Sequence, residues 1–92
     1  MKKYFVCAVF DVKVSSFMAP FLAPALGKAS RFFEDMLADQ GMPFGKHPED
    51  YRLFHLGSFD EDTGRFENLD APMLIVDGEQ LSAPVLRAVR RC

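Results

Sequence analysis

The sequence predicts an α+β domain with a small four-stranded, mainly antiparallel sheet and one helix between the first and second strands. Four short stretches are rich in aromatic and β-branched residues, which favour strands. One longer segment repeats its apolar residues at three- and four-residue spacing, as one face of a helix does. A length of 92 residues, of which 49% are hydrophobic and 26% charged, is typical of a single folded domain, which we place at residues 1–92.

The first strand is expected at Lys3–Lys13, because most of this stretch is aromatic or β-branched. Both of its alternating faces are apolar through Val9, so we expect it to be central and covered on two sides. The following segment, Phe17–Pro24, contains two prolines that push the residues before them out of helical geometry. We expect an extended connection whose aromatic residues pack onto the core; the alternative is an exposed contact surface.

The helix follows this connection. Its apolar face consists of Ala25, Leu26, Ala29, Phe32, Phe33, Met36 and Leu37, and its charged side of Lys28, Arg31, Glu34, Asp35 and Asp39. Pro24 is tolerated in a first helical turn, and Gly41 with Pro43 behind it is a stop signal. We expect the apolar face to pack against the sheet. A strand–helix–strand order is also compatible with a parallel crossover.

The other strands are expected at Tyr51–Phe59, Arg65–Leu69 and Pro72–Asp77. The first two form a hairpin, because the polar turn between them ends in Gly64, where a positive φ is often required. A short second helix is expected at the C-terminus, with Ser82 as its N-cap. One helix covers one face of a sheet, and the chain contains 10 Phe residues, so the remaining apolar surface predicts a homodimer.

Several classes of protein are not expected. No apolar run approaches the ~20 residues that cross a bilayer, and no signal peptide is indicated. Two cysteines are too few for a disulfide scaffold, which favours a reducing cytoplasm. The sequence contains no phosphate loop, dinucleotide-binding turn or paired metal cysteines, so we expect no catalytic residues, no cofactor and no metal. His47, Glu49, Asp50 and His55 could be imagined as a metal or acid–base site, but nothing in the sequence forces them to converge.

Binding of single-stranded nucleic acid fits the sequence better. Such binding needs cations for the backbone and aromatic faces on which bases stack. Basic and aromatic residues alternate at four places. The candidate contacts are Lys46, Arg52, Arg65, Phe44 and Tyr51. Lys2, Lys3 and the arginines near the C-terminus, Arg87, Arg90 and Arg91, would assist them. Because the same aromatic residues are needed for the core, a protein–protein interaction module that binds a viral or host protein remains the alternative.

Two parts of the chain resemble a known family. The run Phe-Gly-Lys-His-Pro-Glu-Asp-Tyr-Arg-Leu-Phe-His-Leu-Gly-Ser-Phe-Asp at residues 44–60 resembles a segment of the small non-structural protein of gokushoviruses, the single-stranded DNA microviruses of bacteria. Phe17–Pro24, followed by Gly27, Ala29, Arg31 and Phe32, resembles the proline- and phenylalanine-rich loop that enters that family's helix. The opening strand with Asp11 and Lys13 also fits, so the resemblance covers roughly residues 4 to 76. It departs from the family pattern at Ala19-Pro20, where a double proline is common.

The resemblance implies a non-enzymatic phage protein that binds single-stranded DNA while viral genomes are made or packaged. Its place would be the host bacterial cytoplasm, and its partners single-stranded DNA and a second copy of the chain, with no membrane. The resemblance transfers no catalytic residue. The Lys46–Asp50 run need not touch DNA, because Glu49 or Asp50 could cap backbone N–H groups while Pro48 fixes the loop; direct contact with DNA is the alternative.

Overall fold

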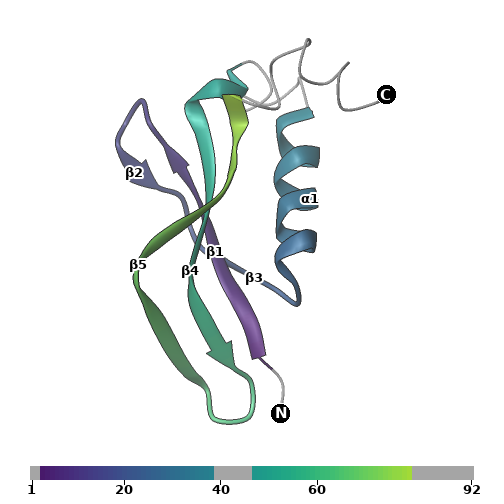
Figure 1. The fold of residues 1–92 in the computed structure, drawn as a ribbon, viewed down its shortest axis with the longest axis vertical. Coiled ribbons are helices and arrows are strands. Elements are labelled where there is room, and N and C mark those ends of the chain that lie inside the picture. Colours follow the sequence, from purple (N-terminus) through teal and green to yellow (C-terminus); the bar gives the residue numbers. More distant parts are fainter. Residues whose placement is uncertain (1–2, 39–46, 80–92) are drawn as a thin grey trace.

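The structure is a computed structural model that describes residues 3–38 and 47–79 (Figure 1). Its elements in chain order are β1 (Lys3–Asp11), β2 (Ser16–Phe17), β3 (Phe21–Ala23), α1 (Leu26–Ala38), a short 3-10 turn η1 (Pro48–Asp50), β4 (Tyr51–Asp60) and β5 (Arg65–Asp77). The predicted α+β class with an antiparallel sheet and one helix is confirmed. The predicted C-terminal helix, with its N-cap at Ser82, lies outside the described residues.

The sheet has five strands, where four were predicted. The segment Phe17–Pro24 is more than a connection, because it contributes to two short strands that pair with β1. Phe17 of β2 lies opposite Phe10, and Ala23 of β3 lies opposite Phe5. The prediction that the helix lies between the first two strands was therefore wrong, since α1 follows β3 and precedes β4.

The strand order is β2-β1-β4-β5, with β3 pairing on β1 as well, and every pairing is antiparallel. A parallel crossover between the first strand and the strand after the helix is absent, because β1 and β4 run in opposite directions. The parallel crossover instead connects β3 to β4. Both β3 and β4 are antiparallel to β1, so they are parallel to each other, and α1 carries the chain across β1 from one to the other.

The two strands predicted at 65–69 and 72–77 form one continuous strand, β5, at an edge of the described sheet. The pairing register between β4 and β5 explains why the sequence pattern predicts two strands here. Gly57 pairs with Asn68, but His55 pairs with Met73, so four residues of β5 bulge opposite a single residue of β4. Pro72 lies inside this bulge, where its missing N–H does least damage to the ladder.

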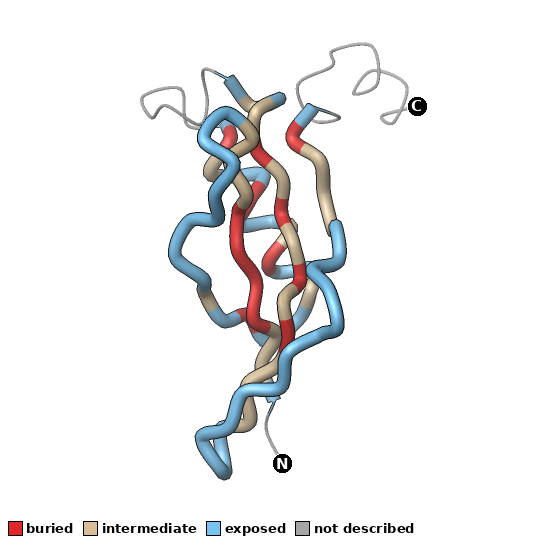
Figure 2. The backbone as a smooth tube through the Cα atoms, turned by 90° about the vertical axis from the view of Figure 1, so that its left-hand side faces the viewer, coloured by how far each residue is buried: buried red, intermediate tan, exposed pale blue. Residues whose placement is uncertain are grey.

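The helix packs on one face of the sheet with a narrow stripe. Ala29, Phe33 and Leu37, each four residues apart, are buried, and they form one core cluster with Cys7, Val9, Ala23, Tyr51 and Leu53. The buried residues follow the central strands in Figure 2. Phe32 was expected on the packed face but is 52% exposed. Each helical residue turns by about 100°, so the neighbour of a residue in a narrow stripe points away from it.

The described residues contain no helix long and apolar enough to cross a membrane.

Candidate functional site

The seven predicted contact residues do not gather in one place. Lys2, Phe44 and Lys46 lie outside the described residues. The structure brings Lys3 and Arg65 to one depression and places the other two residues elsewhere.

Tyr51 lies in the core at the start of β4. Its side chain is only 9% exposed and belongs to the cluster that packs beneath α1. Burial raises the pKa of the Tyr51 hydroxyl, and the carboxylates of Asp11 and Asp50 raise it further. A ring in this position offers no exposed face on which a base could stack.

Arg52 is the next residue of β4 and points to the opposite face of the sheet. Its Nε lies 3.4 Å from Oδ2 of Asp77 on β5, and the two residues are also paired in register. The Arg52 side chain is 40% exposed, whereas its Nε is buried and has no hydrogen-bonding geometry to any described partner. Arg52 therefore has an accessible charge that a neighbouring carboxylate already offsets.

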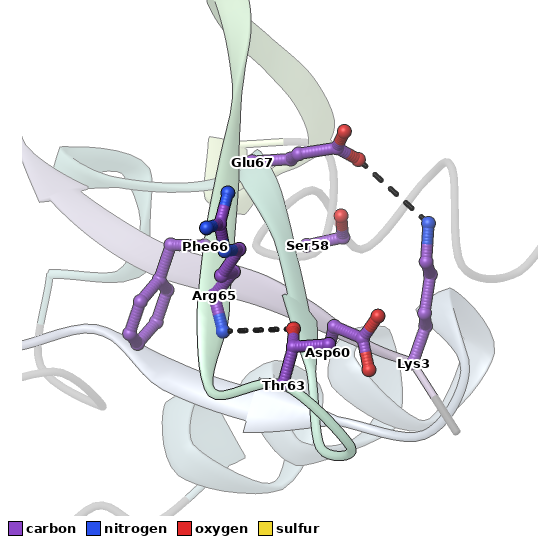
Figure 3. A pocket seen from close by; sticks show the side chains of 7 residues that line it. All are labelled: Lys3, Ser58, Asp60, Thr63, Arg65, Phe66 and Glu67. Carbon is purple, nitrogen blue, oxygen red and sulfur yellow. Dashed lines mark hydrogen bonds and ion pairs between the residues drawn. The ribbon is translucent and has the colours of Figure 1, made fainter. Parts of the chain in front are cut away.

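Lys3 and Arg65 line a shallow depression of about 420 Å³ at the turn end of the β4–β5 hairpin. Figure 3 shows the side chains that surround it, which are Lys3, Ser58, Asp60, Thr63, Arg65, Phe66 and Glu67. Lys3 Nζ lies 3.7 Å from Oε1 of Glu67, and the Arg65 backbone N–H donates to Thr63 Oγ1 at 3.3 Å. Phe66 is 62% exposed, with its ring 4.8 Å from that of Phe59.

Electrostatics at this hairpin work against a phosphate backbone. Asp60 and Glu67 line the same depression as the two cations, and Glu61 and Asp62 form the adjoining turn. The carboxylate of Glu61 also raises the pKa of the Tyr4 hydroxyl, first through its charge and then through a hydrogen bond, and desolvation of Tyr4 adds to the rise. The depression has an exposed ring and two cations, but its local charge is not positive.

A second surface, which the sequence did not reveal, combines the same residue types with fewer acids. Phe32 of α1 and Phe21 of β3 have ring centroids 5.0 Å apart, and Phe32 is half exposed. Lys28 and Arg31 precede Phe32 by four and one residues and are both exposed. Two shallow depressions of about 320 and 510 Å³ share Lys28 and Phe32 in their walls.

We call this set, Phe21, Lys28, Arg31 and Phe32, the helix surface. Neither Lys28 nor Arg31 forms an ion pair with another described residue, although Asp35 stands at one end of the larger depression. A signal for it existed, because Lys28, Arg31 and Phe32 have the i, i+3, i+4 spacing of helical neighbours. Phe32 was expected in the core, so this spacing was not interpreted as a binding surface.

Three potential metal ligands do converge, although the sequence did not predict it. Donor atoms of His47, Glu49 and Asp50 lie within 4.8 Å of one another. The turn holds them in place, since the Asp50 N–H donates to the His47 carbonyl at 3.0 Å and the Asp50 carbonyl accepts from the Val12 N–H at 2.9 Å. His47 and Glu49 are exposed, with Nδ1 3.7 Å from Oε2. Contact in solvent between an exposed imidazole and an exposed carboxylate explains this geometry without a metal.

His55 is not part of that group. Its Nε2 lies 2.9 Å from the Gly57 carbonyl oxygen, which can only accept, so Nε2 donates. The ring packs edge-on against Phe5 at 5.3 Å and is 8% exposed. His55 is therefore a buried structural residue of β4.

Comparison with known protein families gives a match over most of the chain. A family model described as Phage ORF5 protein matches residues 4–81. No curated protein and no solved structure matches the chain.

Proposed function

This chain belongs to the Phage ORF5 protein family, and we propose that it binds single-stranded DNA during synthesis or packaging of a viral genome, without enzymatic activity. The family match supports a phage protein. The finer assignment, to the non-structural protein of gokushovirus-type microviruses acting in the host bacterial cytoplasm, is part of the proposal and rests on the motifs at residues 17–32 and 44–60.

The observation that carries the proposal is the half-exposed ring of Phe32 with two cations beside it. A base of any identity has a flat face that can stack on such a ring, which contributes ~1–3 kcal/mol per base. Side chains three or four positions apart on a helix are neighbours, so Lys28 lies next to Phe32 and Arg31. Phosphates that flank the stacked base would meet these cations, and Phe21 would support the ring from behind.

The hairpin is the weaker of the two surfaces for DNA. Both have an exposed ring and two cations, but Lys3 is already paired with Glu67, and the acidic turn follows directly. Like charges repel a phosphate backbone over roughly one Debye length, about 10 Å at moderate salt. We therefore assign the primary contact to the helix surface and leave Arg65, Lys3 and Arg52 as secondary contacts to be tested beside it.

A titration of labelled oligothymidylate tests the assignment. Fluorescence anisotropy at several salt concentrations gives both the affinity and its salt dependence. Replacing Phe32 by Ala should weaken binding roughly 5- to 150-fold, the equivalent of one lost stacking contact. Lys28→Ala and Arg31→Ala should each reduce the slope of log affinity against log salt by about 0.7, the value for one phosphate contact on a single strand.

Lys13→Ala is the matched control. Lys13 is also exposed, but it lies in the turn after β1, and only its backbone N–H makes a described hydrogen bond, to Asp11. This variant loses one positive charge and should keep the wild-type salt slope. If the wild-type protein shows no salt-sensitive binding at micromolar concentration, DNA binding is refuted. If only Arg65→Ala and Phe66→Ala weaken binding, the contact lies at the hairpin.

A protein–protein interaction module is the second candidate, and the β5 edge favours it. The outer side of β5 pairs with no other described strand over its 13 residues. Phe66, Leu69, Met73 and Leu74 along it are 62%, 37%, 50% and 50% exposed. An extended segment of a viral or host protein could add a strand there. Absence of oligonucleotide binding, together with loss of a partner on Met73→Lys substitution, would favour this function.

A further inference from the structure

The sheet face opposite α1 is apolar and has no described helix over it. Side chains of a strand alternate between faces, and Cys7 and Val9 of β1 belong to the cluster beneath α1, so Ala8 and Phe10 point to the other side. Register extends this side to Phe54 and Leu74, which lie in line with Ala8. A one-residue bulge in β4 at Leu56 then brings Phe59 and Phe66 into line with Tyr4, which is on the same side of β1 as Ala8. We call Phe10, Phe17, Phe54, Phe59, Phe66 and Leu74 the open face.

Three rings form the centre of the open face. The centroids of Phe10 and Phe17 are 4.9 Å apart, those of Phe17 and Phe54 5.6 Å, and those of Phe10 and Phe54 6.1 Å, all in edge-on geometry. Phe17 nevertheless remains 41% exposed, and Leu74 beside the group is 50% exposed. The cluster is thus a packed half-core whose outer side meets solvent in a single chain.

The area matches what a stable interface needs. With about 200 Å² for a fully exposed aromatic side chain, the exposed parts of the six side chains amount to roughly 400 Å². A standard interface buries about 800 Å² per partner, of which somewhat more than half is apolar. The open face by itself therefore supplies most of the apolar area of one such interface.

The small core of the described residues indicates that the chain is stabilised by a partner that is always present. The largest fully buried side chains are those of Phe33, Leu53 and Cys7, whereas nine large hydrophobic side chains among the described residues are exposed. Small domains that bury so little are marginally stable alone. The one partner available whenever the chain is made is another copy of it.

Charge at the rim is consistent with self-pairing. Arg52 and Asp77 lie 3.4 Å apart beside Phe54, so the open face carries one cation and one anion at the same edge. A two-fold interface uses the same patch on both subunits, so that patch must be complementary to itself. A face of neutral rings with one balanced ion pair meets that condition, because no uncompensated charge is buried when two copies meet.

We propose that the open face is the interface of a two-fold homodimer, with the ring cluster of Phe10, Phe17 and Phe54 at its centre and Leu74 beside it. The helix surface, on the other side of the sheet, then faces outward in both subunits. DNA binding and dimerisation are separate properties, so either can fail while the other holds.

Sedimentation equilibrium over a wide range of protein concentration tests the dimer. The wild-type protein should have twice the chain mass of 10.4 kDa at micromolar concentration. Phe17→Glu and Leu74→Glu each place a charge on an exposed part of the open face, from different strands, and both should give monomers. Phe32→Glu is the matched control, since it puts the same charge on a half-exposed ring of the other face and should leave the dimer intact.

Circular dichroism identifies any variant that has lost its fold. NMR spectroscopy tests the wild-type protein without any variant. A soluble paramagnetic agent should broaden the resonances of the Phe17 ring only when the protein is diluted below the dissociation constant of the dimer. A wild-type monomer at all concentrations would overturn the proposal. So would folded Phe17→Glu and Leu74→Glu variants that remain dimeric, or a dimer that only Phe32→Glu disrupts. Monomers of both open-face variants beside a dimeric control would support it.

Discussion

Replacing Gly57 by Ala should destabilise the protein strongly, because β5 passes directly over this residue. A Cβ on Gly57 would collide with the Glu67 carbonyl oxygen and lie 3.0 Å from Asn68 Cα and 3.1 Å from the Glu67 carbonyl carbon. All three atoms belong to the β5 backbone, so no side-chain rotation can relieve the overlap. Gly57 also marks the register shift where the bulge of β5 begins.

The loss of stability depends on how far the β5 backbone must shift to make room for the new Cβ. Overpacking that shifts backbone costs about 1–3 kcal/mol and sometimes more, and we expect about 3 kcal/mol here because no flexible group is involved. For a domain of this size, 1 kcal/mol changes the melting temperature by about 4–8 °C, so the variant should melt roughly 12–24 °C below the wild type. Thermal and urea unfolding followed by circular dichroism measure this, at one fixed protein concentration because a dimer's stability depends on it.

Gly27→Ala is the matched control for this substitution. Gly27 lies in the first turn of α1, and a Cβ there would meet nothing within 4 Å. Alanine is the better helix former by about 0.5–1 kcal/mol, so this variant should be unchanged or slightly more stable. If Gly57→Ala melts with the wild type, the close passage of β5 over β4 is refuted, and the placement of Phe66 and Arg65 at the hairpin falls with it.

Two further predictions concern titratable groups. Glu61→Gln should lower the pKa of the Tyr4 hydroxyl toward its ordinary value near 10, because the charge of Glu61 is the main cause of its rise. A raised folded-state pKa contributes stability that is complete below about pH 10 and is lost as the pH rises through the folded-state value, so this variant should lose less stability in alkali; ultraviolet titration and alkaline unfolding measure both effects. Cys7 is fully buried, and burial raises the pKa of its thiol. Its alkylation, followed by peptide mass spectrometry, should be roughly 100-fold slower in the native protein than in urea, and equal rates would show that the β1 core is open.

Local pattern was sufficient for the long elements. The aromatic and β-branched run of β1, the alternation in β4 and the helical spacing of α1 placed these elements to within a few residues. Each has enough residues for its period to be read, and each period reflects local backbone geometry. The turn at Gly64 was predicted for the same reason, and its φ of 75° confirms the requirement for glycine there.

Short or irregular strands could not be read in this way. β2 and β3 have two and three residues, too few for a period, and they are strands only because β1 offers them a partner. Pro72 reads as a strand start, yet in the folded chain it lies within a bulge of β5. Pairing with distant residues decides such cases, and a local pattern carries no record of it.

The candidate sites divide along the same line. The residue types for stacking and phosphate contact are visible in the sequence, but their exposure is not. Tyr51 and Phe32 are both aromatic residues in apolar stretches, and the fold buries the first and exposes the second. Which of them a nucleic acid can reach depends on the rotation of α1 against the sheet and on the face of β4 that it covers.

The amino-acid sequence by itself determined the α+β class, the main strands, the helix and the excess of aromatic side chains, because these depend on composition and on local periodicity. Only the tertiary structure decided that the chain crosses over β1, that β5 is a single bulged edge strand, and that the excess rings gather on one open face. Those features arise from contacts between residues far apart in the chain, where many pairings have similar local preferences and only packing selects one.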